Sequence, residues 1–285
     1  MPKKMKFNWG ETLKKIKEQE NKNKNSFKDE RIYYPKFADD GTAQAVIRFL
    51  PSPDTDLPWV NVYSHSVQGN GWYIENCPTT LGNDCPVCKA NTDCWNAGDE
   101  QTARNRKRRL SYYSNILVVK DPQTPENNGK VFLYRYGIKI HNLIMEKMDP
   151  GEGSIVEQAF VHDFEEGVNF NLIIKKIKTG KNKTESNYDS CKFVDSTSPI
   201  GSNSQIEKIE NQLFNLNEFI SPDKFKPFSE LEERFNRVVG ITGINKPTPA
   251  STTNQTVTNE VETDSVDEFD MSDSDQDDFL NSLED

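Results

Sequence analysis

One histidine and three cysteines lie within 24 residues, in a pattern that is typical of metal binding. The stretch reads HSVQGNGWYIENCPTTLGNDCPVC and contains His65, Cys77, Cys85 and Cys88, separated by 11, 7 and 2 residues. The C-x-x-C spacing lets two thiolates face one ion across a tight turn. Cys77 and His65 can complete a tetrahedron, so the pattern predicts one zinc ion per chain.

The same spacing leaves two alternatives open. Cys94 is a rival fourth ligand in a four-cysteine site, and the residues can also be reduced, partly buried thiols without a metal. Cys191 is interpreted as an ordinary buried thiol. Four protein ligands leave no open position for water, so we expect the zinc to stabilise the fold without catalysing a reaction.

The known catalytic zinc patterns fit this sequence poorly. Zinc deaminases need a glutamate two residues after the histidine and a proline before the C-x-x-C pair. Here Val67 and Asp84 occupy these positions. A zinc-dependent nuclease is the alternative, but His141 and His162 stand alone, without a clustered acidic or histidine site. We therefore predict that the chain is not an enzyme.

A second pattern combines basic and aromatic residues. The run RNRKRR, residues 104–109, leads directly into Tyr112 and Tyr113, and Tyr134, Arg135 and Tyr136 follow about twenty residues later. Rings that stack on bases, beside cations that pair with phosphates, are typical of single-stranded nucleic-acid binding. The alternative interpretation is that the rings belong to the core and the basic run is a solvated face.

The elements that must position these residues are mostly strands. Alternating or continuous apolar residues predict strands over 44–51, 114–122, 130–140 and 168–178. Two helices are predicted near the C-terminal end of the core, one from Ser204 to about Leu216 and one from Ser229 to Gly240. The fold class is therefore mainly β with flanking helices.

Charge divides the chain into a core and two unusual ends. Residues 1–20 hold six lysines and three glutamates around Trp9, Leu13 and Ile16, which predicts a basic amphipathic arm. Residues 251–285 hold 12 acidic residues and no lysine or arginine, so this tail should be disordered. The expected organisation is an arm (1–20), a core (21–246) with a zinc subdomain at about 62–110, and a linker and tail (247–285).

The motifs AQAVIRFLPS, GWYIENC, CPVC, SNILVVKDPQTPENNGKVFLYRYG, SNYDSCKF and DKFKPFSELEERF span nearly the whole chain. In these motifs the sequence resembles the single-stranded DNA-binding (helix-destabilising) proteins of T-even-type bacteriophages. The resemblance implies an OB-fold core that carries zinc, an arm for head-to-tail cooperativity, and an acidic tail that recruits replication, recombination and repair proteins. It favours His65 over Cys94 as the fourth ligand.

The resemblance also implies a set of DNA-binding residues. Together with neighbours from the basic and aromatic runs, the candidates are Arg48, Trp95, Lys107, Arg108, Arg109, Tyr112, Tyr113, Tyr134, Arg135, Tyr136 and Tyr188. The candidates for cooperativity are Lys3, Lys4 and Lys6. The sequence departs from the family pattern where Glu185 replaces an aromatic residue and where a tyrosine before the C-x-x-C pair is missing.

The expected function is sequence-independent, cooperative binding of single-stranded DNA during phage replication, recombination and repair. The expected partners are single-stranded DNA, further copies of the chain, and replication, recombination and repair proteins that bind the tail. No apolar stretch follows the N-terminal lysines, so we expect a protein that is not secreted. The resemblance implies that it acts in the cytoplasm of the infected bacterial host.

Overall fold

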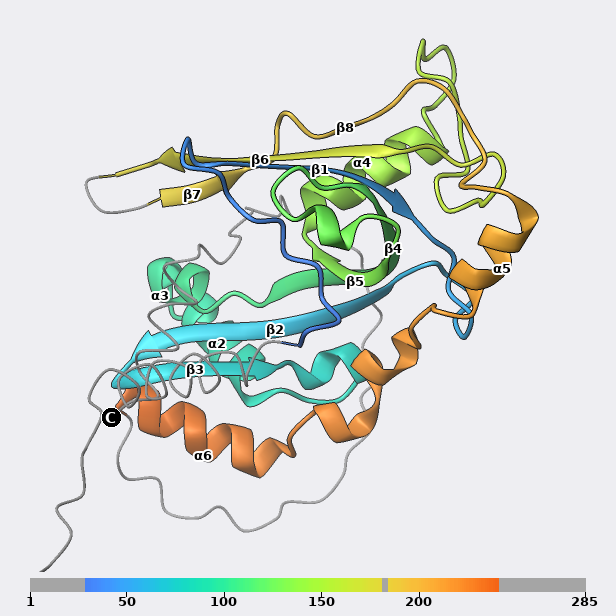
Figure 1. The fold of residues 1–285 in the computed structure, drawn as a ribbon. Helices are drawn as coiled ribbons and strands as arrows, with labels where there is room; N and C mark the ends of the chain where they lie inside the picture. The colour runs from blue at the N-terminus through green and yellow to red at the C-terminus, as the bar shows by residue number, and fades with distance from the viewer. Residues whose placement is uncertain (1–28, 181–183, 241–285) are drawn as a thin grey trace, which may run out of the picture.

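The structure is a computed structural model that describes residues 29–180 and 184–240 (Figure 1). The predicted arm and acidic tail lie outside these described residues. The described part is an antiparallel β-sheet with helices packed around it, which confirms the predicted fold class. Its strands are β1 (Thr42–Phe49), β2 (Val60–Gly69), β3 (Gly71–Asn76), β4 (Arg109–Lys120), β5 (Val131–Tyr136), β6 (Phe170–Lys178), β7 (Thr184–Asn187) and β8 (Lys192–Phe193).

The sheet is organised around the long strand β4. The strand order is β3-β2-β4-β1-β6-β7, with β5 also paired to β4 and β8 to β6. The first residues of β4 pair with β2, and its last residues pair with β1. Because one twelve-residue strand serves three neighbours, the sheet can bend around its own apolar face, as in an OB-fold core.

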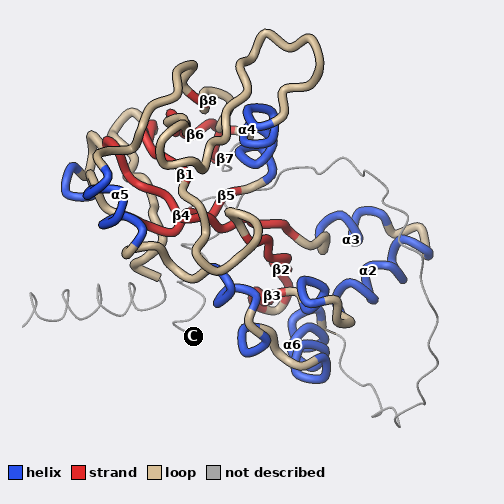
Figure 2. Tube along the Cα trace, turned by 90° about the vertical axis from the view of Figure 1, so that its right-hand side faces the viewer, coloured by secondary structure: helices blue, strands red, loops and turns tan. Residues whose placement is uncertain are grey.

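The helices form two groups on this sheet. The helical elements are η1 (Pro78–Leu81), α2 (Pro86–Asn96), α3 (Glu100–Asn105), η2 (Pro125–Asn127), α4 (Ile138–Met148), α5 (Asn203–Glu210), η3 (Leu216–Ile220), η4 (Pro222–Lys224) and α6 (Phe228–Val239). Helices α2, α3 and α6 gather around β2 and β3, whereas α4 lies with β6 and β8 in the other part of the molecule (Figure 2).

The main core uses alternate positions of the central strands. On β1 the inward residues are Ala43, Ala45, Ile47 and Phe49, and all four are buried. Strand β6 contributes its own alternating set to the same core. This is the period of two that the sequence predicted, and it places one face of each strand in the core.

A smaller core holds α6 against the β2–β3 hairpin and α2. Tyr73 of β3 and Phe235 of α6 pack with ring centroids 5.7 Å apart. Gly69 is needed here because a Cβ at this position would lie 2.2 Å from the carbonyl oxygen of Val238. The backbone N–H of Asn70 donates to that same oxygen at 2.7 Å, so hairpin and helix meet backbone to backbone.

Two histidines lie in or beside the main core rather than at a catalytic site. The rings of His141 and His162 both pack against Trp59, with centroids 5.1 and 5.6 Å away. The two ring nitrogens of His162 are buried and have no hydrogen-bond partner within the described residues. Burial, reinforced by the nearby His141, lowers the pKa of His162 to about 3.

This histidine should make stability depend on pH. Between its ordinary pKa of about 6.5 and the folded value near 3, the unfolded chain binds a proton that the folded chain refuses. Stability should therefore fall as pH drops below about 6.5, approaching 1.4 kcal/mol per pH unit from this group. Urea unfolding at pH 7.5 and pH 5 should show a smaller loss for His162→Leu than for the parent. Equal losses would contradict the assignment, and acid effects on other groups cancel in this difference.

Candidate metal centre and nucleic-acid surface

The four predicted zinc ligands lie along the run of elements from β2 through β3 and η1 to α2. His65 lies on β2, and Cys77 follows β3 directly and forms the N-cap of η1. Cys85 is the N-cap of α2, Pro86 opens that helix, and Cys88 lies in its first turn. Proline is favoured at this helix position because it needs no hydrogen-bonded N–H. The C-x-x-C pair therefore lies at a helix N-terminus, where the helix dipole favours thiolates.

The four ligand atoms converge on one point. All lie within 4.8 Å of one another, and three of the four residues are buried. Nε2 of His65 is 3.5 Å from Sγ of Cys85 and 3.3 Å from Sγ of Cys88, and Sγ of Cys77 is 3.6 Å from Sγ of Cys88. A tetrahedral zinc site with ordinary bond lengths separates its ligand atoms by about 3.3–3.8 Å. The donor set and its spacing therefore fit a metal ion such as zinc.

The electrostatics of the cluster also favour a cation. Hydrogen bonds from Cys85 and Cys88 lower the pKa of the Cys77 thiol far below its usual range. Burial opposes the protonation of His65, but hydrogen bonds to Cys77 and Cys85 outweigh it and raise the histidine pKa to about 9. The protonated imidazole of His65 thus balances the negative charge on sulfur, and a metal ion can replace that proton.

The other nitrogen of His65 connects the centre to the basic run. Nδ1 lies 3.2 Å from the carbonyl oxygen of Arg106, which can only accept a hydrogen bond. Nδ1 therefore donates a hydrogen bond to this oxygen, and a metal ion that displaced the Nε2 proton would meet the Nε2 lone pair together with the three sulfur atoms. Cys94 is outside the cluster, and its sulfur lies 3.8 Å from Nη1 of Arg106. The geometry therefore favours His65 over Cys94 as the fourth ligand.

The basic run borders the metal centre and carries three cation–ring pairs, one of which places the guanidinium of Arg106 5.4 Å from the ring centroid of Phe235. The guanidinium of Arg108 lies 4.1 Å from the ring centroid of Tyr63 and donates to Thr79 Oγ1 at 2.9 Å. The guanidinium of Arg104 lies 5.3 Å from the ring centroid of Trp95, a side chain that is 41% exposed. Lys107 is also exposed, whereas Arg109 at the start of β4 is half-buried.

Three candidate tyrosines on β4 and β5 lie in the core and not on the exposed surface. Tyr112, Tyr134 and Tyr136 are all buried on the core face, and the ring of Tyr136 stacks at 5.6 Å on Tyr112 and 5.8 Å on Tyr134. His141 extends this row by stacking 3.9 Å from Tyr112. The structure thus brings the three tyrosines together, but as core residues. Direct DNA contact by these rings stays a prediction.

The remaining candidates are divided between interior and surface. Arg48 is 1% exposed, and its guanidinium donates to Asn169 Oδ1 and to the carbonyl oxygen of Ser198, both at 3.0 Å. Tyr113 is half-buried and stacks on Phe219 with centroids 4.2 Å apart. Tyr188 packs against the edge of the main core. A DNA contact by Arg48 stays a prediction, because in this structure its donors bind other parts of the chain.

Sequence reasoning missed an exposed ring in the neighbourhood of the candidate residues Tyr113 and Arg135. Tyr34 is 48% exposed and lies close enough to Arg135 and Tyr113 for both to influence its pKa, which burial raises most strongly. Tyr113 and Arg135 are themselves cross-strand partners on β4 and β5. The neighbouring pair of tyrosines at positions 33 and 34 is a local signal, but only the packed structure brings Tyr34 next to the cation.

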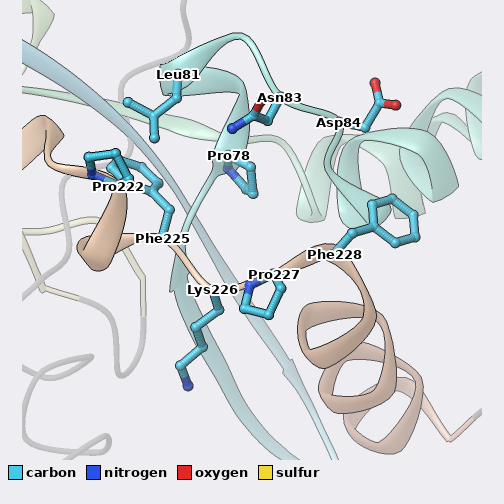
Figure 3. Close-up of a pocket in the computed structure, with 9 residues that line it drawn as sticks. All are labelled: Pro78, Leu81, Asn83, Asp84, Pro222, Phe225, Lys226, Pro227 and Phe228. Atoms are coloured by element: carbon cyan, nitrogen blue, oxygen red, sulfur yellow. The ribbon is translucent and has the colours of Figure 1, made fainter.

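The pocket shown in Figure 3 lies beside the metal centre. It has a volume of about 350 Å³. Its lining is mainly apolar and comes from η1 and the chain around η4: Pro78, Leu81, Asn83, Asp84, Pro222, Phe225, Lys226, Pro227 and Phe228. Within the described residues, three or more histidine, cysteine or carboxylate side chains converge only at the cluster around His65. The pocket itself therefore offers an apolar surface and no catalytic constellation.

Comparison with known proteins identifies the class of molecule. A family model described as "gp32 DNA binding protein like" matches residues 41–239. The single-stranded DNA-binding protein of Enterobacteria phage T2 is 36% identical over 275 residues, which cover 92% of this chain and 87% of that protein. The single-stranded DNA-binding protein of Enterobacteria phage T4 is 37% identical over 256 residues, covering 85% and 81%.

The chain therefore belongs to the gp32-like family of DNA-binding proteins, which confirms the resemblance seen in its motifs. These relatives are named for DNA binding and not for catalysis, in agreement with the prediction that the chain is not an enzyme. In the part of the chain that the structure describes, no helix is long and apolar enough to cross a membrane.

Proposed function

We propose that this protein binds single-stranded DNA cooperatively and without reading its sequence. It coats and protects single strands during phage DNA replication, recombination and repair. The observation that carries this proposal is the basic run next to the metal centre. The guanidinium of Arg104 lies over the exposed ring of Trp95, that of Arg108 lies over the ring of Tyr63, and Lys107 is exposed. Cations for phosphates beside a ring for bases are what a sequence-independent single-strand binder needs. The names of the relatives support the same ligand.

The proposed metal is one structural zinc ion per chain, held by His65, Cys77, Cys85 and Cys88. Its role is to fix the C-x-x-C turn and the backbone at Arg106 in one arrangement. Residues 104–109 are then presented as an ordered surface. The preference for zinc rests on three sulfur ligands and one nitrogen ligand at tetrahedral spacing.

The two ends of the chain are proposed to provide cooperativity and partner binding. The arm, with Lys3, Lys4 and Lys6, is proposed to contact the neighbouring copy on the same strand. The tail, residues 251–285, is proposed to recruit replication, recombination and repair proteins, because Phe269 and Phe279 lie among its 12 acidic residues. Such a segment can dock its apolar side chains on basic, apolar partner surfaces.

Tryptophan fluorescence tests the proposal directly. Oligo-dT should quench the emission of the full-length protein, and a duplex of the same length should quench it far less at the same concentration. The difference should persist at two salt concentrations, while the affinity for oligo-dT falls as salt rises. Equal affinity for duplex and single strand, or no quenching by either, would contradict single-strand binding.

Arg108→Ala should lower the salt dependence of that binding. Loss of one phosphate contact lowers the slope of log K against log salt by about 0.7 for a single strand. Arg237→Ala is the matched control, because Arg237 lies on α6 and pairs with Glu233 at 3.3 Å on the surface. The control should keep the parental slope. A parental slope for Arg108→Ala as well would remove Arg108 from the DNA-binding surface.

A further inference from the structure

The chain between α4 and β6 carries an unusually one-sided charge. We define the acidic loop as residues 145–166, from the last turns of α4 to the approach to β6. It contains seven acidic side chains: Glu146, Asp149, Glu152, Glu157, Asp163, Glu165 and Glu166. Its single basic residue, Lys147, is buried. Within the described residues none of the seven forms an ion pair with a lysine or arginine. Asp163 is half-buried near Arg48 and accepts from the N–H groups of Glu165 and Glu166, whereas the other six are exposed.

The acidic loop also exposes apolar side chains. Ile155 is fully exposed, Phe160 is 62% exposed, and Met145 and Val156 are exposed as well. Gln158 Nε2 donates to the Met148 carbonyl at 2.8 Å, and the Ala159 N–H donates to the Lys147 carbonyl at 3.0 Å. These bonds fold the loop back along the end of α4, so the apolar and acidic residues belong to one local surface.

This surface projects from the molecule on the side away from the metal centre. The yellow-green chain that follows α4 extends beyond the helix in Figure 1, and Figure 2 shows it well separated from α2, α3 and α6. Exposed apolar residues surrounded by unpaired charges of one sign are typical of an interaction site for a partner of opposite charge. The required partner is a basic segment that also has apolar anchors.

The chain itself contains such a segment at its N-terminal end. Residues 1–20 carry six lysines and three glutamates, and their apolar residues Trp9, Leu13 and Ile16 have the spacing of one helix face. We propose that the acidic loop is the docking surface for the basic arm, residues 1–20, of the neighbouring copy on single-stranded DNA. This inference rests on the proposed cooperative function and names the surface through which neighbouring copies make contact.

The pocket of Figure 3 is the competing apolar surface, and its charge fits the arm less well. Lys226 in its lining pairs with Glu75 at 2.9 Å and with Glu230 at 3.3 Å. Positive and negative groups are therefore mixed there, and Arg234 adds a further cation beside Glu75. A basic arm gains more from the acidic loop, where seven carboxylates face one buried lysine.

A charge exchange tests the contact. The quantity measured is the ratio of affinity for long poly-dT to affinity for an oligo-dT that holds one protomer, at one salt concentration. Glu152→Lys with Glu157→Lys should lower this ratio about tenfold, and so should Lys3→Glu with Lys4→Glu in the arm, because exposed ion pairs contribute modestly and act together. All four substitutions in one chain should restore most of the ratio, because the opposite charges meet again.

Two further variants separate apolar docking from general electrostatics. Ile155→Ser with Phe160→Ser changes no charge and should also lower the ratio, while the short-oligonucleotide affinity and the melting temperature stay at parental values. Leu81→Ser alters the pocket of Figure 3 and should leave the ratio unchanged. If Leu81→Ser lowers the ratio and the loop variants do not, the arm docks at the pocket and the inference is wrong.

The remaining outcomes are equally decisive. A four-substitution chain that stays at the lowered ratio would overturn the inference, because restored complementarity would then have no effect. If the loop variants keep the parental ratio but lose binding to a replication protein, the acidic loop binds that protein and not the arm, and the inference is wrong. Failure of the parent to bind the short oligonucleotide would instead refute the proposed DNA-binding function, so the two failures are distinguishable.

Discussion

Cys88→Ser should abolish binding of the proposed zinc ion and strongly destabilise the region around the candidate metal centre. The thiol of Cys88 lies 3.3 Å from Nε2 of His65 and 3.6 Å from Sγ of Cys77, so its loss opens the tetrahedron. Structural zinc sites contribute about 10–16 kcal/mol of apparent binding free energy, which is folding free energy. Even partial loss should lower the melting temperature clearly and expose residues 62–110 to protease.

Cys94→Ser is the matched control for this experiment. Cys94 is also a free cysteine on α2, but its sulfur lies outside the four-residue cluster. This variant should retain one zinc ion per chain by elemental analysis and melt close to the parent. Zinc-free parent protein after purification in reducing, chelator-free buffer would contradict the metal assignment. So would a Cys88→Ser protein with parental melting and protease resistance.

Trp95→Ala should weaken binding of oligo-dT about tenfold without affecting folding. One base stacked on an aromatic ring contributes about 1–3 kcal/mol, which corresponds to about fivefold to 150-fold in affinity. The ring is 41% exposed on α2 and is bordered by Arg104, so its removal leaves no core cavity. Trp95→Phe keeps a stacking ring and should retain most of the affinity. Parental affinity in the alanine variant would place the stacking surface elsewhere.

The strand tyrosines are unsuitable for the same test. Tyr112 and Tyr134 are buried in the main core, where alanine would leave a cavity. Truncation of a large buried aromatic residue costs about 3–5 kcal/mol of stability. Weakened DNA binding in such a variant would therefore report partial unfolding as much as a lost contact.

The sequence predicted the strands that have a clear apolar alternation and missed those that do not. The predicted strands correspond to β1, β4, β5 and β6. The β2–β3 hairpin was missed because its residues are mostly polar or aromatic, although Asn70 and Gly71 form the Asn-Gly pair that is typical of tight hairpins. Helix α4 was predicted as the end of a strand, since Ile138 and Ile140 continue the alternation of β5. Gly137, the N-cap of α4, marks the true boundary.

The helices near the C-terminal end were predicted in kind but not in extent. The first was expected from Ser204 to about Leu216, but α5 ends at Glu210 and Leu216 begins the separate turn η3. The second was expected to begin at Ser229, where Ser229 and Glu232 have the spacing of a capping box, whereas α6 begins at Phe228 after Pro227. A capping box is present at α5, between Ser202 and Gln205. Local propensity identifies such helices, but tertiary contacts set their ends.

The metal centre and the aromatic surface differ in how far sequence can define them. The C-x-x-C pair is a local pattern, so the cluster it nucleates could be predicted from spacing. The tyrosines could not be assigned in the same way, because alternation shows that Tyr134 and Tyr136 share a face but not which face is buried. The neighbourhood of Tyr34 and Arg135 arises from distant parts of the chain, and only the folded structure reveals it.

The hydrogen bond between His65 and the carbonyl of Arg106 connects the proposed metal-binding and DNA-binding equilibria. One nitrogen of this imidazole faces the sulfur cluster, and the other holds the backbone of the basic run that is proposed to meet phosphates. Metal occupancy and DNA occupancy are then thermodynamically linked, and linkage is reciprocal. If bound zinc raises the affinity for DNA, bound DNA must raise the affinity for zinc by the same factor. On a coated strand the protein would therefore hold the metal more tightly against chelators than the free protein does.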